Sequence, residues 1–191
     1  ICTDARRSDP GEIPKTKKNR RTNTMNKADV IAFFDRCAPE WDADMIRNEP
    51  VIQTILDNAD VCAGIDVLDV PCGTRVLIPD YLTRSVRRVR IAKKKFPQES
   101  VKLICGDVES VQLNRQFDCV MVYNAFPHFP NPKGLIDHLA ELVQSGGRLS
   151  IAHGMSRAML TRHHSGSASR VSIELPEAEA VAQMMDEAFR V

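Results

Sequence analysis

Three polar side chains stand at the ends of short apolar runs, and their types suit the binding of a small polar molecule. Carboxylates and amides hold amines and ring nitrogens through hydrogen bonds. The carboxyl ends of parallel strands meet at one edge of a sheet, where ligands of α/β proteins bind. We expect three side chains to line one crevice there: Asp69 in the run 66–70, Asp107 after the run 101–105, and Asn124 after the run 118–123.

The stretch that contains Asp69 reads "VLDVPCGTRVLIPDYLTR", positions 67 to 84. It has the pattern of a short strand that ends in an acid, followed by a tight turn and a helix. Such a unit presents backbone N–H groups and a helix N-terminus to a ligand, as nucleotide-type cofactors require. The stretch therefore predicts a cofactor-binding loop.

Apolar runs of strand length alternate with helical patterns along the chain. The runs are mostly apolar at successive positions, which is typical of strands covered on both faces; they span 66–70, 101–105, 118–123 and 148–153. Helices are expected at about 26–39, 50–59, 132–146 and 176–189, the third ending at the pair Gly146-Gly147. The alternation predicts an α/β fold with a Rossmann-like, mostly parallel sheet and helices on both faces.

Length and composition fit one domain. The 191 residues are 43% hydrophobic, and the net charge of +1 gives no overall preference for nucleic acid or a membrane. No apolar run reaches the roughly 18 residues that span a bilayer. The six cysteines lack CxxC spacing, and the adjacent His163 and His164 match no metal-ligand motif. We expect no metal site, and a location in the reducing cytoplasm.

Residues 1–24 are polar, basic and without periodicity, with seven Lys/Arg against three Asp/Glu. This composition predicts a disordered leader, or translated sequence upstream of a start at Met25. An arm that binds nucleic acid by charge alone is the alternative. The first interpretation is favoured, so nucleic acid is not expected as a partner.

Four segments resemble, in order, the motifs of class I S-adenosylmethionine-dependent methyltransferases of the small-molecule type: "VLDVPCGTRVLIPDYL", "VKLICGDVESV", "FDCVMVYNAFPHF" and "LVQSGGRLSIAHGMSR". The resemblance covers a methyltransferase-like domain at 25–191, with a helical cap at 25–63 and a Rossmann-like core at 64–191. The family fold is a seven-stranded, mostly parallel sheet with helices on both faces. S-adenosylmethionine is the implied cofactor, and a small molecule is the implied methyl acceptor.

The resemblance also implies roles for single residues at the cofactor. Asp69 would accept a hydrogen bond from the methionyl amine, and Gly73 would belong to the first loop. Asp107 would accept from the adenine amine, while the backbone N–H of Val108 would meet a ring nitrogen. Asn124 would line the floor where methyl donor and acceptor meet.

Two histidines follow the later motifs. His128, in "NAFPHF", lies by resemblance near the position of methyl transfer and is the predicted catalytic base; the alternative is a polar loop residue that shapes the pocket. His153, in "HGMSR", could contribute to a loop on the acceptor side or belong to a plain strand-to-helix turn. The sequence does not name the acceptor or the oligomeric state.

The sequence departs from the family pattern in three places. Pro71 and Arg75 replace glycines of the first motif, Asp-x-Gly-x-Gly-x-Gly, and proline fixes φ and lacks an N–H. The basic run 84–95 stands where a second strand with a ribose-binding acid is expected. The chain stops at Val191, where the last two strands would begin. The sheet is therefore expected to lack some strands of the full fold.

These departures leave the activity open between two main interpretations. One is a methyltransferase with impaired cofactor binding, and the other is a non-catalytic pseudoenzyme or truncated remnant that acts, if at all, as a binding module. A third interpretation is a nucleic-acid-associated protein that uses the basic segments. A nicotinamide dehydrogenase is disfavoured because the sequence has no GxGxxG motif.

Overall fold

The computed structural model describes residues 25–40, 47–71, 76–82, 84, 102, 104, 106–186 and 188–189. The predicted leader at 1–24 lies outside these residues, and so do Gly73 and Arg75 of the first motif. Most of the predicted strand at 101–105 and of the basic run at 84–95 also lies outside them.

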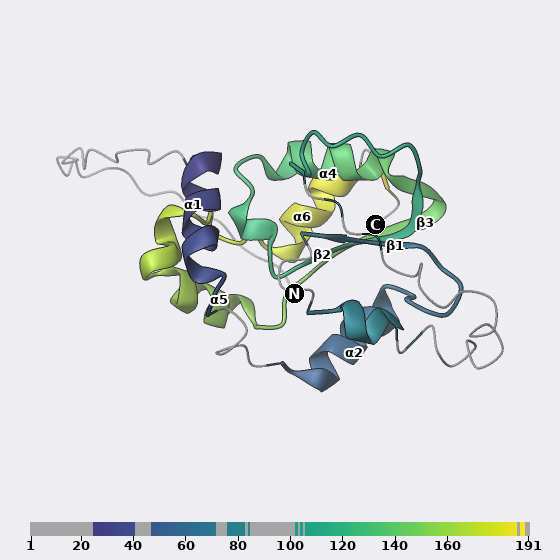
Figure 1. Ribbon diagram of the computed structural model, residues 1–191, viewed down its shortest axis with the longest axis horizontal. Helices are drawn as coiled ribbons and strands as arrows, with labels where there is room; N and C mark the ends of the chain where they lie inside the picture. The colour runs from purple at the N-terminus through teal and green to yellow at the C-terminus, as the bar shows by residue number, and fades with distance from the viewer. Residues whose placement is uncertain are drawn as a thin grey trace, which may run out of the picture.

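A parallel sheet forms the centre of the described structure. Its three strands are β1 (Val67–Val70), β2 (Phe117–Tyr123) and β3 (Val143–Ala152), in the order β1-β2-β3. Both neighbouring pairs are parallel, so the carboxyl ends of all three strands lie at one edge. Figure 1 shows that this edge faces the end of the molecule where α1 and α5 lie. The α/β class and the parallel sheet are as predicted.

The helices begin at residues whose side chains cap them. The α-helices are α1 (Lys27–Cys37), α2 (Glu49–Asn58), α4 (Pro132–Glu141), α5 (Arg157–His164) and α6 (Ala178–Met185), and residues 78–82 are also helical. Two 3-10 turns are η1 (Phe126–His128) and η2 (Ser167–Arg170). The side chains of Asn26, Asn48, Asn131 and Ser156 accept backbone N–H bonds at the starts of α1, α2, α4 and α5.

The glycine pair does not end α4, and that part of the prediction is wrong. The helix ends at Glu141, and β3 begins two residues later. Gly146 has a φ of +79°, and a Cβ on Gly147 would lie 2.9 Å from the carbonyl oxygen of Asp118. The pairing of β2 with β3 is irregular at this point. The glycines therefore form a bulge beside β2, because the apolar residues just before them are drawn into the core.

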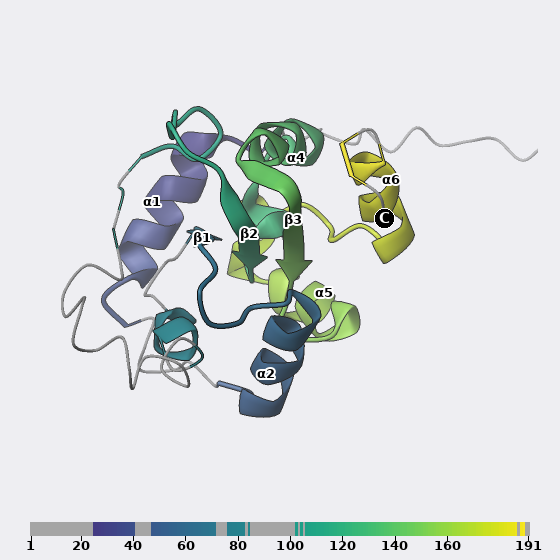
Figure 2. The same cartoon turned by 90° about the vertical axis from the view of Figure 1, so that its right-hand side faces the viewer.

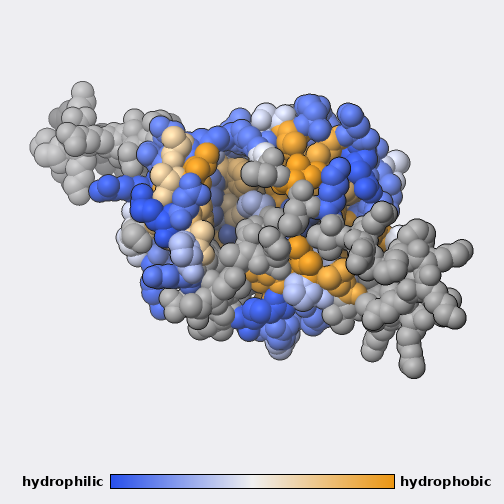
Figure 3. All heavy atoms as spheres, in the orientation of Figure 1, coloured by the Kyte–Doolittle hydropathy of each residue, from blue (hydrophilic) through white to orange (hydrophobic). Residues whose placement is uncertain are grey.

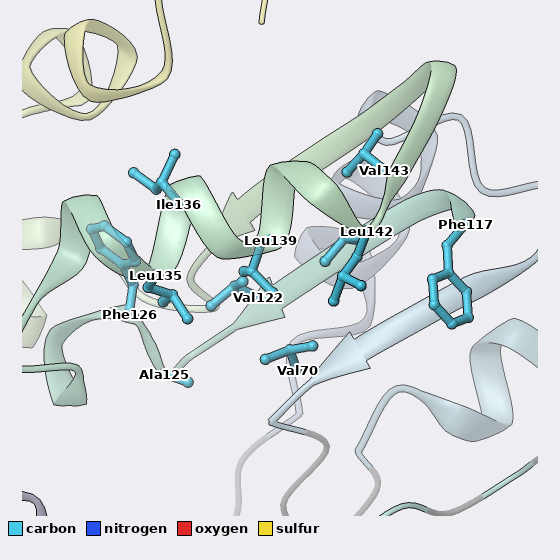
Figure 4. Close-up of a cluster of buried hydrophobic side chains, with 11 residues drawn as sticks. Val70, Phe117, Val122, Ala125, Phe126, Leu135, Ile136, Leu139, Leu142 and Val143 are labelled. Atoms are coloured by element: carbon cyan, nitrogen blue, oxygen red, sulfur yellow. The ribbon is translucent and has the colours of Figure 1, made fainter. Parts of the chain in front are cut away.

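Helices cover both faces of the sheet, as Figure 2 shows with α4 and α6 above it and α2 below it. Alternate residues of β2 point to opposite faces. Val120 and Val122 belong to the cluster that α4 covers, whereas Cys119 and Met121 belong to the cluster that α2 covers. Figure 4 shows the α4 cluster, in which Leu139 and its neighbours on α4 approach the sheet.

Two arginines join α2 to the helical residues 78–82 and 84. The Arg47 Nη2 donates to Oδ2 of the buried Asp80 at 2.8 Å, and Gln53 donates to the other oxygen of that carboxylate at 3.3 Å. Arg84 donates to the Asp57 carboxylate at 2.8 Å and to the backbone oxygen of Gln53 at 3.0 Å. These bonds hold the segment after the first motif against the cap helix.

Apolar side chains also reach the surface at the β1 edge of the sheet, where Figure 3 shows them in orange. Ile31, Leu82 and Ile104 are large hydrophobic residues with exposed side chains. Within the described parts of the chain, no helix combines the length and hydrophobicity that crossing a membrane requires.

Candidate active site at the carboxyl ends of the strands

Asp69 lies within β1, in register with Met121 of β2. Because side chains alternate along a strand, Asp69 shares the α2 face of the sheet with Cys119 and Tyr123. Burial raises the pKa of its carboxyl to about 7. Asp69 is thus an acid that can lose its proton near neutral pH, and a positive charge beside it would favour the ionised form.

Asn124 follows β2 with a φ of +54°, in the left-handed region that asparagine tolerates. Its backbone N–H donates to the Ala152 oxygen at 2.9 Å, and its side-chain Oδ1 accepts from the backbone N–H of Gly154 at 2.7 Å. Asn124 therefore joins the end of β2 to the end of β3. The role of Asn124 that the family resemblance implies, lining the floor where methyl donor and acceptor meet, stays a prediction.

Tyr123 and Gly154 belong to the same site, although the sequence did not single them out. A Cβ on Gly154 would lie 2.6 Å from the Tyr123 hydroxyl, so a larger residue here would displace the Tyr123 side chain. Burial raises the pKa of Tyr123, and a hydrogen bond with the Asn124 side chain opposes that shift. A sequence signal could have pointed to Tyr123 and Gly154. The pair "YN" stands at the end of the apolar run 118–123, and the pair "HG" stands at the end of the run 148–153.

Asp107 lies in a turn and forms an ion pair with α1. Its Oδ2 accepts from Lys27 Nζ at 2.7 Å, and its Oδ1 accepts from the backbone N–H of Glu109 at 3.1 Å. Lys27 also pairs with Glu109 at 2.5 Å. The bond from Lys27 lowers the pKa of Asp107. Val108 is partly buried against the α4 cluster, which anchors the turn.

His128 ends η1, and its surroundings determine its tautomer. The ring Nδ1 lies 2.8 Å from the carbonyl oxygen of Val171. A carbonyl can only accept, so Nδ1 carries the hydrogen and Nε2 has the free electron pair of a base. Burial is the main cause that lowers the pKa of His128, which keeps the ring uncharged at neutral pH. This is the protonation state that a general base needs.

His128 is one of three neighbouring imidazoles. Its ring centroid lies 5.3 Å from that of His164 in α5 and 4.8 Å from that of Phe34 in α1. His153 follows β3, and both His128 and His164 act on it electrostatically. Burial is the largest cause of the pKa shifts of both His153 and His164. It lowers the pKa of His164, and it lowers the pKa of His153 to about 4.

The described residues show how far the predicted site is assembled. Asp69 and Asn124 occupy neighbouring strands near the carboxyl edge, while Gly73 lies outside the described residues. Among the described residues no group of histidine, cysteine and acidic side chains could hold a metal ion. Two hollows of about 230 Å³ and 390 Å³ share Gly147 and Phe189 as lining residues; they lie beside the beginning of β3, away from this site.

The residues present fit part of a nucleoside-type cofactor that carries an amino acid. A buried acid on β1 suits its ammonium group, because the pairing would stabilise the ionised carboxyl. The turn at Asp107 suits an amine and a ring nitrogen once Lys27 has released the Asp107 carboxylate from their ion pair. His128, an uncharged base, lies beyond the end of β2. The types of these side chains are therefore compatible with a cofactor of this kind and with an acceptor that loses a proton.

Comparisons with known proteins indicate which proteins this chain resembles. A family described as "Methyltransferase domain" matches residues 68–151. A malonyl-[acyl-carrier protein] O-methyltransferase of Acetivibrio thermocellus is 26% identical over 166 residues, covering 80% of this chain and 59% of that protein. The corresponding enzyme of Priestia megaterium is 29% identical over 101 residues, covering 44% of this chain and 35% of that protein. The chain thus spans about 59% or less of the length of these relatives.

Among solved structures, a methyltransferase-like protein from Bacillus halodurans C-125 superposes with a TM-score of 0.51 at 18% identity. The match covers 72% of this chain and 67% of that chain. At this identity the likeness concerns the fold alone, and the described sheet has fewer strands than the full fold. The matched domain and the curated relatives support the resemblance of this chain to class I S-adenosylmethionine-dependent methyltransferases.

Proposed function

We propose that the protein binds S-adenosylmethionine at the carboxyl ends of β1 and β2 and methylates a small-molecule acceptor held beside His128. The observation that carries the proposal is the position of Asp69 near the carboxyl end of β1, beside Met121 of β2, where burial raises the pKa of its carboxyl and a positive charge would favour the ionised form. Asn124 and Gly154 support it, because they join the strand ends on which a ligand would lie.

Each cofactor residue has a separate task in this proposal. Asp69 accepts from the methionyl ammonium, and Asp107 with the N–H of Val108 holds the adenine edge after Lys27 has left. Asn124 keeps the strand ends in place beneath the reacting groups. S-adenosylmethionine supplies an electrophilic methyl group on a sulfonium. The protein contributes mainly by positioning, which accounts for much of the rate in such transfers.

His128 serves the acceptor. With a hydroxyl or amine acceptor, its Nε2 takes the proton that must leave; with a carboxylate, no proton has to leave and the ring orients the oxygen. Malonyl thioesters are the first acceptors to test, since curated relatives are malonyl-[acyl-carrier protein] O-methyltransferases. The free thiols of Cys37, Cys62 and Cys119 are compatible with the reducing cytoplasm, where we expect the protein to act.

Calorimetric titration with S-adenosylmethionine and S-adenosylhomocysteine tests the binding half of the proposal. We expect micromolar Kd values for the full chain and a loss of at least about tenfold in Asp69→Asn. Asp137→Asn, an exposed change on α4, is the matched control and should bind as the parent does. Absence of binding at millimolar ligand would contradict the proposal.

A radiolabelled methyl-transfer assay against malonyl thioesters and a panel of small hydroxyl and amine compounds tests the catalytic half. His128→Gln should lower kcat by about 10²-fold or more if the acceptor must lose a proton, without changing cofactor affinity. Equal kcat in both proteins with every hydroxyl or amine acceptor would remove the base role.

The second candidate function is a non-catalytic binding module, and one contact favours it. Lys27 occupies the carboxylate of Asp107, the group that the adenine amine would need. If this ion pair persists, the adenine site is closed. The calorimetric titration separates the two candidates, since a protein of this second kind binds neither cofactor form.

A further inference from the structure

The end of β3 carries a buried imidazole without a hydrogen-bond partner. Both ring nitrogens of His153 are shielded from solvent, and neither has a partner among the described residues. A shielded polar group that is left unpaired lowers the stability of the fold. Its retention therefore calls for an explanation, and ligand binding is one.

His153 lies beside two other imidazoles and no charged neighbour is recorded for it among the described residues. Its electrostatic neighbours are His128 of η1 and His164 of α5, both uncharged at neutral pH because burial lowers their pKa values. The chain from Gly154 to Ile173, which contains α5 and η2, has no Asp or Glu. Arg157 of this stretch pairs with Glu174 and Glu177, which follow it. The N–H of an uncharged imidazole suits an anion better than an ammonium group.

We propose that His153, with His128 and His164, forms an acceptor site that selects molecules bearing a carboxylate, and that His153 donates its ring N–H to that carboxylate. This inference rests on the proposed methyl transfer and adds a specificity-determining residue to it. His128 and His153 have different roles because their hydrogen bonds differ. Val171 already fixes Nδ1 of His128, whereas both nitrogens of His153 can turn to the incoming molecule.

The ring nitrogens of His153 are shielded, so a ligand reaches them only if an element of the site moves. Helix α1 is suited to move, because none of its residues is buried. It contacts the site through the edge of Phe34 on His128 and through the ion pairs of Lys27 with Asp107 and Glu109. Elements with few buried contacts open at low free-energy cost. We therefore expect the acceptor to displace α1 from His128.

Calorimetry with the full chain and a malonyl thioester of N-acetylcysteamine tests this site, in the presence of S-adenosylhomocysteine. The matched probe is the methyl ester of the same compound, which lacks the charge and carries one added methyl group. The parent protein should bind the acid at least tenfold more tightly than the ester. His153→Phe should remove this preference, while His153→Asn, which keeps a donor, should retain part of it.

His163→Phe is the matched control, because His163 is the exposed neighbour in α5. It should keep the full preference for the acid. Ring ¹⁵N shifts of His153 provide a readout independent of turnover and should move with the acid and not with the ester. Circular dichroism checks that each variant folds, and the Asn variant keeps the test valid if the Phe variant does not.

The outcomes separate the two proposals. If S-adenosylhomocysteine binds but acid and ester bind equally, or if His153→Asn and His153→Phe both keep the parent's preference, the histidine site is wrong and the methyltransferase proposal stands. If the acid moves the His153 signals while S-adenosylhomocysteine fails to bind, the carboxylate site stands and the proposed methyl transfer is wrong. Failure of both ligands overturns both.

Discussion

On the α4 face of the sheet the contacts are almost purely apolar, whereas on the α2 face an apolar layer is combined with charged groups. Leu135, Ile136 and Leu139 of α4 are fully buried against β2. The α2 face instead contains Asp69 and is bordered by the Arg47–Asp80 pair. The difference indicates that the α4 face supplies stability and the α2 face gives up some stability to position an acid.

The largest expected effect is on the α4 face. Leu139→Ala should lower the free energy of unfolding by about 2–5 kcal/mol, because the side chain is fully buried and leaves a cavity. Urea unfolding measures it. Cofactor affinity of the folded protein should be unchanged. Glu141→Ala on the same helix is exposed and should change stability by less than about 0.5 kcal/mol; a similar loss in both variants would contradict the contrast.

The next effect concerns Asp69 and pH. Its pKa is raised to about 7 in the folded protein, so the stabilisation linked to its proton is present below about pH 4 and is lost as pH rises to 7. At pH 8 the free energy of unfolding of Asp69→Asn should therefore exceed that of the parent, by at most about 2–4 kcal/mol. Thermal unfolding at pH 4 and pH 8 measures this.

Cofactor binding should change in the opposite direction in the same variant. The ionised carboxyl is the form that pairs with an ammonium group, so the parent's affinity should rise between pH 6 and pH 8. Asp69→Asn should bind weakly and without this pH dependence. A variant that gains stability and keeps its affinity would show that the acid serves no ligand.

A smaller effect is expected where α2 meets residues 78–84. Asp80→Ala should cost about 1–3 kcal/mol, because Arg47 and Gln53 lose a buried acceptor. Asp57→Ala removes the exposed partner of Arg84 and should cost less than about 1 kcal/mol. Chemical denaturation compares the two variants. Equal losses would mean that burial of Asp80 does not matter.

The smallest effect is at Lys27. Lys27→Gln removes an exposed ion pair with Asp107 that competes with the adenine amine, so cofactor affinity should rise by up to about fivefold, or about 1 kcal/mol. Lys133→Gln, which breaks an exposed pair with Asp137 on α4, is the control. Titration of both variants with S-adenosylhomocysteine measures the change, and a weaker Lys27 variant would assign Lys27 to cofactor binding instead.

Much of the fold was predictable because it depends on local patterns. Apolar runs at 66–70, 118–123 and 148–153 became strands, and the helices expected at about 26–39 and 50–59 begin at Lys27 and Glu49. The end of α4 was not predictable, since Gly146-Gly147 is a plausible helix stop by itself. The pairing of Phe117 with Val143 shows that β3 begins before Gly146 and Gly147, and this pairing is a tertiary contact.

The sequence by itself determined the fold class, the family resemblance and the positions of Asp69, Asn124 and His128 after or within strands, because these follow from periodicity and order along the chain. The tertiary structure alone decided which groups meet. The contact of Lys27 with Asp107 joins residues 80 positions apart, and the tautomer of His128 depends on Val171, 43 positions away. Such partners are set by packing between elements, which no local pattern encodes.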